Sequence, residues 1–247
     1  MTDLAMAPVE TPVMGVDAHP GVAEFPPLDQ LPPLRTALLS TTRGVFRQAL
    51  GGLWNVSVIG QHNVPATGPV ILAANHIGTL DGPLLVAHTP RTLALAKSEL
   101  FTSKVGPFLH AAGQIPVSRD YADVRAVKRC LQVLRDERVL AIFPEGRRGL
   151  GDMTDLKGGA AYLAMVSGAP IVPVAILGTR MPSGHLKSTP PLGSTMHIVY
   201  GEQVHIPMHE FPRRKADVAA ATKYLGQVCR EHLREAETLT GMSLPGA

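Results

Sequence analysis

The stretch Val70-Ile71-Leu72-Ala73-Ala74-Asn75-His76-Ile77-Gly78-Thr79-Leu80-Asp81-Gly82-Pro83 decides the fold of this chain. Its first five residues form an apolar run, which is typical of a strand covered on both faces of a sheet. Asp81 followed by Gly82-Pro83 predicts the start of a helix, with Asp81 as N-cap and proline in the first turn. A buried strand that leads directly into a helix indicates an α/β architecture.

His76 and Asp81 in this stretch form a candidate pair for proton transfer. A histidine can act as a general base, and a carboxylate can hold its ring in one orientation. Residues five apart on a regular helix point about 140° from one another, so the pair can meet only if Gly78-Thr79 interrupts the helix. The alternative is that Asp81 merely caps a helix and His76 packs at the end of a strand.

The five-residue spacing carries little weight by itself. A glutamate follows four other histidines at the same spacing: His19/Glu24, His197/Glu202, His205/Glu210 and His232/Glu237. The position of His76 is more informative, because open α/β sheets bind ligands beyond the carboxyl ends of their strands. We therefore expect His76 to lie in a functional site.

The charge of the chain is unevenly distributed. Residues 1–31 contain five acidic residues, many prolines and no lysine or arginine, which predicts a disordered or loosely attached tail without the pattern of a secretory signal. The remainder carries all 23 basic residues and 15 of the 20 acidic ones, a net charge of +8. Such a body suits an anionic membrane surface or a phosphorylated substrate. With aromatics at 4% and no basic stripe, nucleic acid is a poor candidate partner.

The two cysteines and the apolar runs indicate the environment of the protein. Cys130 and Cys229 belong to no Cys-x-x-Cys pair, so we predict no metal site and expect buried thiols in a reducing compartment. No apolar stretch approaches the roughly 18 residues that span a bilayer. This pattern predicts a soluble or peripheral protein.

The periodicity of apolar residues predicts one α/β domain over residues 55–247, with a mostly parallel, mixed central sheet flanked by helices. Residues 32–54 precede it as an amphipathic helical segment, which either packs on the core or lies in a membrane interface. Asp120 or Asp123 is expected to cap the helix near 124–134. The predicted strands are 56–60, 70–74, 93–97, 114–117, 139–143, 170–176, 195–200 and 202–206, and the other predicted helices are 82–89, 105–112, 158–167 and one from about 216.

Polar and basic clusters follow several predicted strands, and the carboxyl ends of parallel strands meet at one edge of a sheet. Arginine and lysine at such an edge could bind a phosphate group. The basic candidates are Lys97, Arg119, Arg148 and Lys157. The chain has no Gly-x-Ser-x-Gly elbow and no phosphate-binding loop of the Gly-x4-Gly-Lys type. We therefore expect the His–Asp pair to activate a hydroxyl of the substrate directly, without a covalent enzyme intermediate.

Four blocks of sequence resemble those of the glycerolipid acyltransferases related to bacterial 1-acylglycerol-3-phosphate acyltransferase. They are Asn75–Asp81, Gly113–Arg119, Phe143–Gly149 and Ile171–Val174, in this order, and the resemblance covers about residues 53–206. The third block is commonly Phe-Pro-Glu-Gly-Thr-Arg-Ser in that family. Here Arg147 replaces the threonine and Gly149 the serine, and Gly158 stands where a second lysine is common.

The resemblance implies that His76 removes the proton of the acceptor hydroxyl and that Asp81 holds the imidazole. It also implies acceptor-binding roles for Arg119, Glu145, Gly146 and Arg148, and more weakly for Lys97 and Lys157. The implied reaction moves an acyl group from acyl-CoA or acyl carrier protein, as co-substrate and without another cofactor, to lysophosphatidic acid. The product is phosphatidic acid, and the implied location is cytoplasmic, peripheral on the inner face of the cell membrane.

Other functions remain open from the sequence. The same mechanism could serve another lysophospholipid, glycerol phosphate or a glycolipid. A hydrolase could use His76 to activate water, and a catalytically silent lipid-binding protein is a more remote alternative. The sequence does not distinguish oligomeric states.

Overall fold

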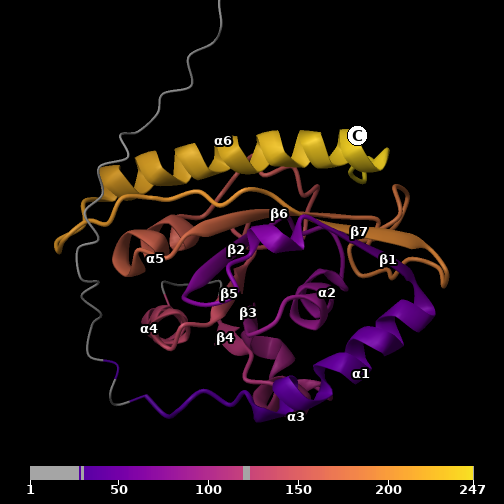
Figure 1. Cartoon of the computed structure of the whole chain (residues 1–247), viewed down its shortest axis with the longest axis horizontal. Helices are drawn as coiled ribbons and strands as arrows, with labels where there is room; N and C mark the ends of the chain where they lie inside the picture. The colour runs from indigo at the N-terminus through magenta and orange to yellow at the C-terminus, as the bar shows by residue number, and fades with distance from the viewer. Residues whose placement is uncertain (1–27, 29–30, 119–122, 247) are drawn as a thin grey trace, which may run out of the picture.

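The structure of the protein is a computed structural model that describes residue 28, residues 31–118 and residues 123–246. Most of the predicted acidic tail and Arg119 lie outside the described residues. The remainder forms one mixed sheet with helices on both faces, as the sequence predicts (Figure 1).

The sheet has seven strands in the order β1-β7-β6-β2-β5-β3-β4. Strands β6, β2, β5, β3 and β4 are parallel to one another, whereas β7 runs antiparallel to β6 and parallel to β1. The strands are β1 (Asn55–Ile59), β2 (Val70–Ala74), β3 (Thr92–Lys97), β4 (Ile115–Val117), β5 (Val139–Ile142), β6 (Ile171–Leu177) and β7 (Thr195–Tyr200). Five strands therefore end at the same edge of the sheet.

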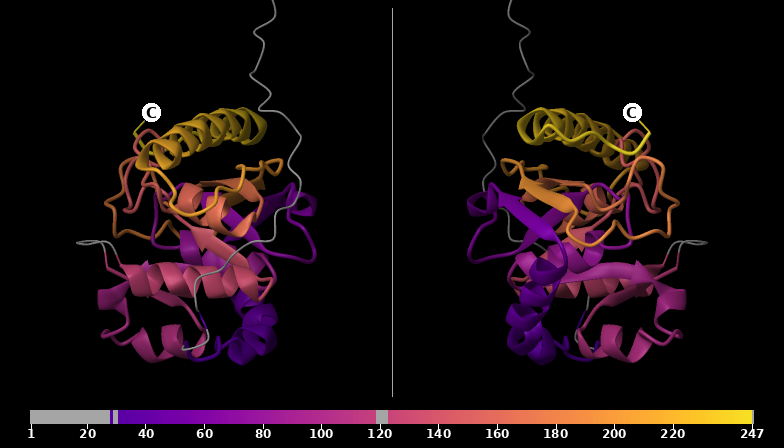
Figure 2. Two further views of the ribbon diagram at one scale, coloured as in Figure 1. Left: turned by 90° about the vertical axis from the view of Figure 1, so that its left-hand side faces the viewer. Right: turned by 90° about the vertical axis from the view of Figure 1, so that its right-hand side faces the viewer.

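Helices cover both faces of the sheet, and alternate residues of each central strand face opposite layers. The helices are α1 (Ala37–Leu53), α2 (Asp81–His88), α3 (Gly106–Ala111), α4 (Val124–Arg135), α5 (Gly159–Ser167) and α6 (Lys215–Thr240), with short 3₁₀ turns η1 (Gln61–Asn63) and η2 (Ser98–Leu100). In β2, Ile71 and Ala73 face the core beneath α4, α5 and α6, whereas Leu72 faces the core beneath α1 and α2. Figure 2 shows α6 on one side of the sheet and α1 on the other.

Two sequence predictions of local structure need correction. The helix expected over 32–54 begins only at Ala37, because the prolines at 32 and 33 favour an extended backbone. The strand expected over 202–206 is reduced to a single bridge between Ile171 and Val204. Pro173 of β6 has no N–H to donate, so the ladder beside Gly201 is interrupted. The predicted cap is confirmed at Asp123, which accepts a hydrogen bond from the Ala126 amide at 3.0 Å.

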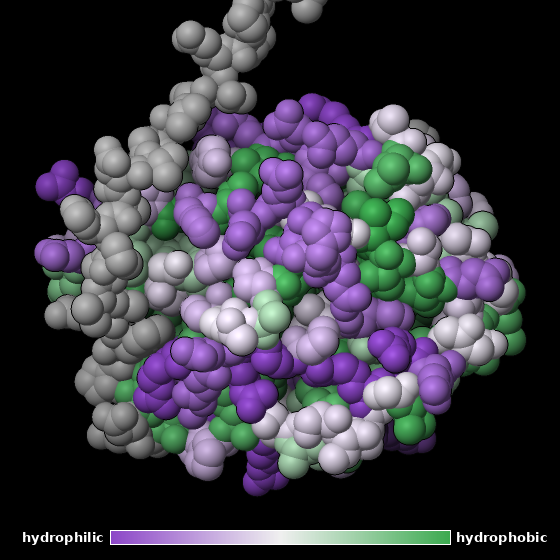
Figure 3. Space-filling model, viewed as in Figure 1, coloured by the Kyte–Doolittle hydropathy of each residue, from purple (hydrophilic) through white to green (hydrophobic). Residues whose placement is uncertain are grey.

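Helix α1 buries one face and exposes another. Leu39 and Leu50 are buried in the core, and the centroid of the Phe46 ring lies 6.4 Å from that of Phe108 in α3. Val45 on the opposite side is 69% exposed. On the face drawn in Figure 3, hydrophilic side chains gather in clusters, with separate hydrophobic areas between them. None of the helices among the described residues combines the length and apolar character needed to cross a membrane.

Candidate active site

The predicted pair of His76 and Asp81 is in direct contact at the carboxyl end of β2. Nδ1 of His76 lies 2.7 Å from Oδ2 of Asp81. A carboxylate only accepts hydrogen bonds, so Nδ1 carries the proton and Nε2 has a free lone pair. No hydrogen bond among the described residues reaches Nε2, and the His76 side chain is 14% exposed. This is the arrangement that a general base requires.

Four hydrogen-bond donors hold the Asp81 carboxylate in place. The prediction that Asp81 is the N-cap of α2 is wrong. Leu80 occupies the cap position without a side-chain hydrogen bond, and Asp81 is the first helical residue. The carboxylate turns back instead and accepts from the amides of Ile77 and Gly78, each at 2.8 Å. The hydroxyl of Thr179 donates to its other oxygen. The side chain is completely buried, so these donors replace the water that an ionised carboxylate requires.

Gly78 permits the close approach of the loop after β6. A Cβ atom at this position would lie 2.6 Å from the backbone oxygen of Thr179. Only a residue without a side chain lets the two loops touch here. The turn at Gly78 therefore allows both the return of Asp81 toward His76 and the contact with Thr179.

Glu145 fixes the backbone of His76. Its Oε2 accepts from the His76 amide at 2.8 Å, and its Oε1 accepts from the Met153 amide at 3.2 Å. Burial raises the pKa of Glu145, the two amide hydrogen bonds oppose this shift, and the charges of Asp152 and Asp81 add to it. The carboxylate thus joins the loops after β2 and β5, and its predicted role in acceptor binding stays a prediction.

Two further contacts orient His76. The ring of Phe143 stacks on the imidazole, with centroids 4.2 Å apart and planes inclined by 23°. The carbonyl of His76 accepts a hydrogen bond from the amide of Gly149 at 2.9 Å. Residues of the third sequence block therefore contact the ring, the amide and the carbonyl of His76.

Among the described residues, the predicted basic side chains Lys97, Arg148 and Lys157 lie at the same edge but contact other groups. Arg148 donates to the carbonyl of Leu186 at 3.0 Å. Lys97 pairs with Glu99 at 2.5 Å, and the exposed Lys157 lies 3.9 Å from Asp155. Gly146 has a left-handed backbone (φ 72°), and the Lys157 side chain passes over it. The structure brings His76, Asp81 and Glu145 together by contact, whereas phosphate binding by the basic residues stays a prediction.

Three further residues of the site were not predicted from the sequence to have a role in it. Asn75 exchanges two hydrogen bonds with the backbone of Ile176, Thr179 contacts Asp81, and Arg180 donates to the carbonyl of Gly149 at 2.8 Å. Thr179 and Arg180 follow β6 at the edge where the other functional strands end. The basic candidates were chosen because they follow the carboxyl ends of parallel strands, and Thr179 and Arg180 follow β6 in the same way.

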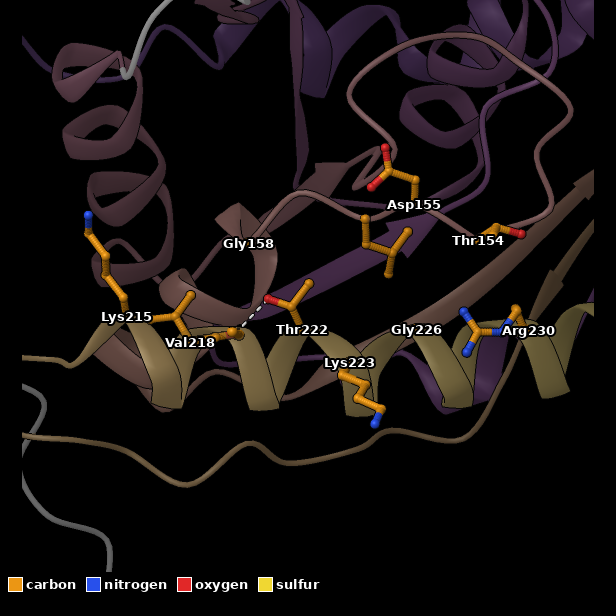
Figure 4. A pocket seen from close by; sticks show the side chains of 11 residues that line it. Thr154, Asp155, Gly158, Lys215, Val218, Thr222, Lys223, Gly226 and Arg230 are labelled. Atoms are coloured by element: carbon orange, nitrogen blue, oxygen red, sulfur yellow. Dashed lines mark hydrogen bonds between the residues drawn. The ribbon is translucent and has the colours of Figure 1, made fainter.

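A groove of about 530 Å³ lies beside the site, between α6 and the segment that leads to α5 (Figure 4). Its lining includes Lys215, Lys223 and Arg230 but none of the predicted site residues. Arg230 donates to the carbonyl of Met153 at 2.9 Å, so α6 supports the loop that Glu145 holds. His76 and Asp81 lie outside this groove, so the candidate site is identified by the contact between these two side chains and not by the size of a cavity.

Comparisons with known proteins agree with this geometry. Residues 55–177 match the family described as Acyltransferase. The 1-acyl-sn-glycerol-3-phosphate acyltransferase of Bacillus subtilis is 31% identical over 179 residues, which cover 71% of this chain and 87% of that protein. The chloroplastic enzyme LPAT1 of Arabidopsis thaliana is 29% identical over 202 residues, covering 73% of this chain and 53% of that protein.

A solved structure has the same fold. The crystal structure of the 1-acyl-sn-glycerophosphate acyltransferase PlsC from Thermotoga maritima superposes with a TM-score of 0.61 at 22% identity, covering 81% of this chain and 80% of that one. The resemblance first indicated by the four sequence blocks is confirmed. The chain belongs to the acyltransferase family and is an O-acyltransferase.

Proposed function

We propose that this enzyme transfers a fatty acyl group from an acyl thioester to the free hydroxyl of lysophosphatidic acid, which yields phosphatidic acid. The observation that carries the proposal is the 2.7 Å contact between His76 and Asp81, which leaves Nε2 free at the end of a buried strand. The names of the relatives supply the acceptor, since the proteins from Bacillus subtilis and Arabidopsis thaliana are both 1-acyl-sn-glycerol-3-phosphate acyltransferases.

In the proposed step, Nε2 of His76 takes the proton of the acceptor hydroxyl as its oxygen attacks the thioester carbonyl. The C–O bond forms, the C–S bond breaks, and the thiolate leaves with the proton that His76 had taken. Asp81 stabilises the imidazolium between these two transfers. Because Thr179 and two amides hold its carboxylate, the aspartate is oriented before the substrate binds.

The acceptor phosphate is proposed to bind beside this pair. Arg148 is half-buried and retains N–H groups beyond its bond to Leu186, and guanidinium groups suit phosphate oxygens. Gly146 provides close backbone approach, and Lys157, Lys97 and Arg119 are further candidates. Glu145 is proposed to act by positioning His76. The co-substrate is acyl-CoA or acyl carrier protein, and the reaction needs no other cofactor.

The proposed location is cytoplasmic, at the inner face of the cell membrane. The exposed Val45 and Leu53 of α1 would enter the interface, with Arg47 near the lipid phosphates. This arrangement leaves the inward face of α1 packed on the core, so the two alternatives for this helix are compatible.

A panel of acceptors tests the proposal most directly. Purified enzyme is incubated with radiolabelled acyl-CoA or acyl carrier protein and with lysophosphatidic acid, other lysophospholipids, glycerol 3-phosphate or a glycolipid. We expect the largest kcat/KM with lysophosphatidic acid. A clear preference for another acceptor would reassign the substrate, and thioester loss without acceptor would indicate a hydrolase.

A variant of Arg148 tests phosphate binding. Arg148→Ala is expected to raise the KM for lysophosphatidic acid about 10- to 150-fold, because a hydrogen bond to a charged group contributes about 1.5–3 kcal/mol. The KM for the acyl donor should not change. An unchanged KM for the acceptor would remove Arg148 from the proposed site.

A further inference from the structure

A small cavity lies at the edge of the sheet opposite His76. It occupies about 120 Å³ between α1 and the entry ends of β3 and β5, and its lining includes Arg43, Arg91 and Arg138. Because β2, β3 and β5 are parallel, their entry ends face away from the active-site edge. The volume is well above the roughly 10–15 Å³ that one water molecule requires, so a small polar group fits.

Three guanidinium groups line this cavity without a carboxylate. Arg91 donates to the carbonyls of Pro65, Gly68 and Glu137. Arg43 donates through Nε to the carbonyl of Val86 at 3.1 Å. The terminal nitrogens of Arg43 have no hydrogen-bond or ion-pair partner within residues 31–118 and 123–246. The guanidinium group of Arg138 has none in these ranges either.

The lack of a counter-ion is energetically unfavourable. Burial lowers the pKa of Arg43, and the like charge of Arg138 lowers it further. A half-buried cation is stabilised by an anion that accepts its hydrogen bonds. The hydroxyl of Thr36 lines the same cavity and can donate to such an anion, whereas the hydroxyls of Ser40 and Thr92 donate to the carbonyls of Ala37 and Pro90. Several donors around a small space match the oxygen-rich phosphate group better than a single carboxylate.

We propose that the cavity of Arg43, Arg91 and Arg138 binds a phosphate group, carried by a phospholipid headgroup or by a soluble phosphate, at a site separate from acyl transfer. The cavity is lined by Ser40 and Arg43 of α1 and by Thr36 at the N-cap of this helix, so ligand binding would hold the helix against the sheet. The site is distinct from the acceptor site, because the two lie at opposite edges.

The experiment compares Arg138→Gln with the matched control Arg47→Gln. Arg47 is an exposed arginine of α1 outside the cavity, so both variants lose one positive charge on the same side of the protein. Binding is measured to phosphatidylcholine vesicles with and without phosphatidylglycerol, which is neither acceptor nor product of the proposed reaction. Thermal unfolding is measured with and without inorganic phosphate.

General attraction to an anionic surface is worth about fivefold in affinity per arginine. Because Arg47 lies in the proposed interface, Arg47→Gln should lose at least as much of this attraction as Arg138→Gln. We expect Arg138→Gln to lose about a further tenfold for phosphatidylglycerol vesicles if a lipid headgroup is the ligand. If the ligand is a soluble phosphate, inorganic phosphate should raise the Tm of the wild type and of Arg47→Gln but not that of Arg138→Gln. Equal behaviour of the two variants in both assays would overturn the proposal.

A second variant keeps the test decisive if Arg138→Gln folds poorly. Ser40→Asp places a carboxylate among the arginines and supplies the missing counter-ion. We expect it to raise the Tm without phosphate and to abolish both ligand effects. A lowered Tm together with unchanged responses would contradict the site.

Discussion

Replacing Thr179 by valine removes one hydroxyl from the active site and nearly preserves the side-chain volume. The hydroxyl is completely buried and donates to Oδ1 of Asp81. A hydrogen bond to a charged group contributes about 1.5–3 kcal/mol, and we expect the free energy of unfolding to fall by about that amount. The carboxylate keeps its three donors on Oδ2, so its position is loosened and not lost.

The kinetic effect follows from that loosening. With Oδ1 free, the carboxylate can rotate away from the plane that aligns it with His76, and we expect kcat to fall about tenfold, equivalent to about 1.4 kcal/mol. KM values for donor and acceptor should stay constant, because Thr179 is proposed to act only through Asp81. Steady-state rates with a labelled acyl thioester and urea unfolding measure the two effects.

Two controls separate positioning from general destabilisation. Thr179→Ser keeps the hydroxyl and should restore kcat. Thr89→Val removes another buried hydroxyl, which bonds to Tyr200 at 2.7 Å; it should lower stability by about 0.5–1.5 kcal/mol without changing kcat. A Thr179→Val enzyme with wild-type kcat, or a Thr89→Val enzyme with the same loss, would refute the reasoning.

Three further predictions concern neighbouring groups. Gly78→Ala should reduce kcat at least tenfold, because its Cβ would lie 2.6 Å from the Thr179 carbonyl oxygen. Steady-state rates measure this effect, and circular dichroism checks that the variant is folded. Undiminished turnover would contradict the close approach. Glu145→Gln should lower kcat, since an amide can accept from only one of the two backbone groups. Burial raises the pKa of Glu145, so the wild-type rate should fall on acidification at a higher pH than exposed glutamates titrate, and this decline should be absent in the variant's pH profile. Burial lowers the pKa of His232 below 6.5, so its contribution to stability is complete above about pH 6.5 and lost below it. Between about pH 7.5 and 5.5, the free energy of unfolding in urea should therefore decline less in His232→Gln than in the wild type. Equal declines would exclude His232 as the cause.

Much of the fold is predictable because its central strands are buried on both faces. Runs such as Val139–Ile142 and Ile171–Leu177 contain no charged residue, and both form strands. The prediction of a strand was wrong where a residue distant in sequence lacks the backbone N–H that the strand needs as a partner. The alternation over 202–206 resembles a strand, but Pro173 cannot supply its ladder. The late start of α1 could have been read from the prolines at 32 and 33.

The site is predictable only where its residues are close in sequence. His76 and Asp81 share one loop, so their contact could be anticipated from the break at Gly78. Thr179 is 98 positions from Asp81, and only the neighbouring positions of β2 and β6 in the sheet bring the two together. Glu145 shows a different limit, because residue type does not tell whether a carboxylate binds a substrate or the backbone amides that the structure shows.

The reaction of the His76→Ala enzyme under single-turnover conditions tests the central claim most directly. Enzyme in excess over labelled acyl thioester is mixed with saturating lysophosphatidic acid, and the labelled lipid product is followed with time. Loss of the proposed general base should lower the rate of acyl transfer about 10²–10⁴-fold while urea unfolding shows an intact fold. Transfer at the wild-type rate by a folded His76→Ala enzyme would contradict the account.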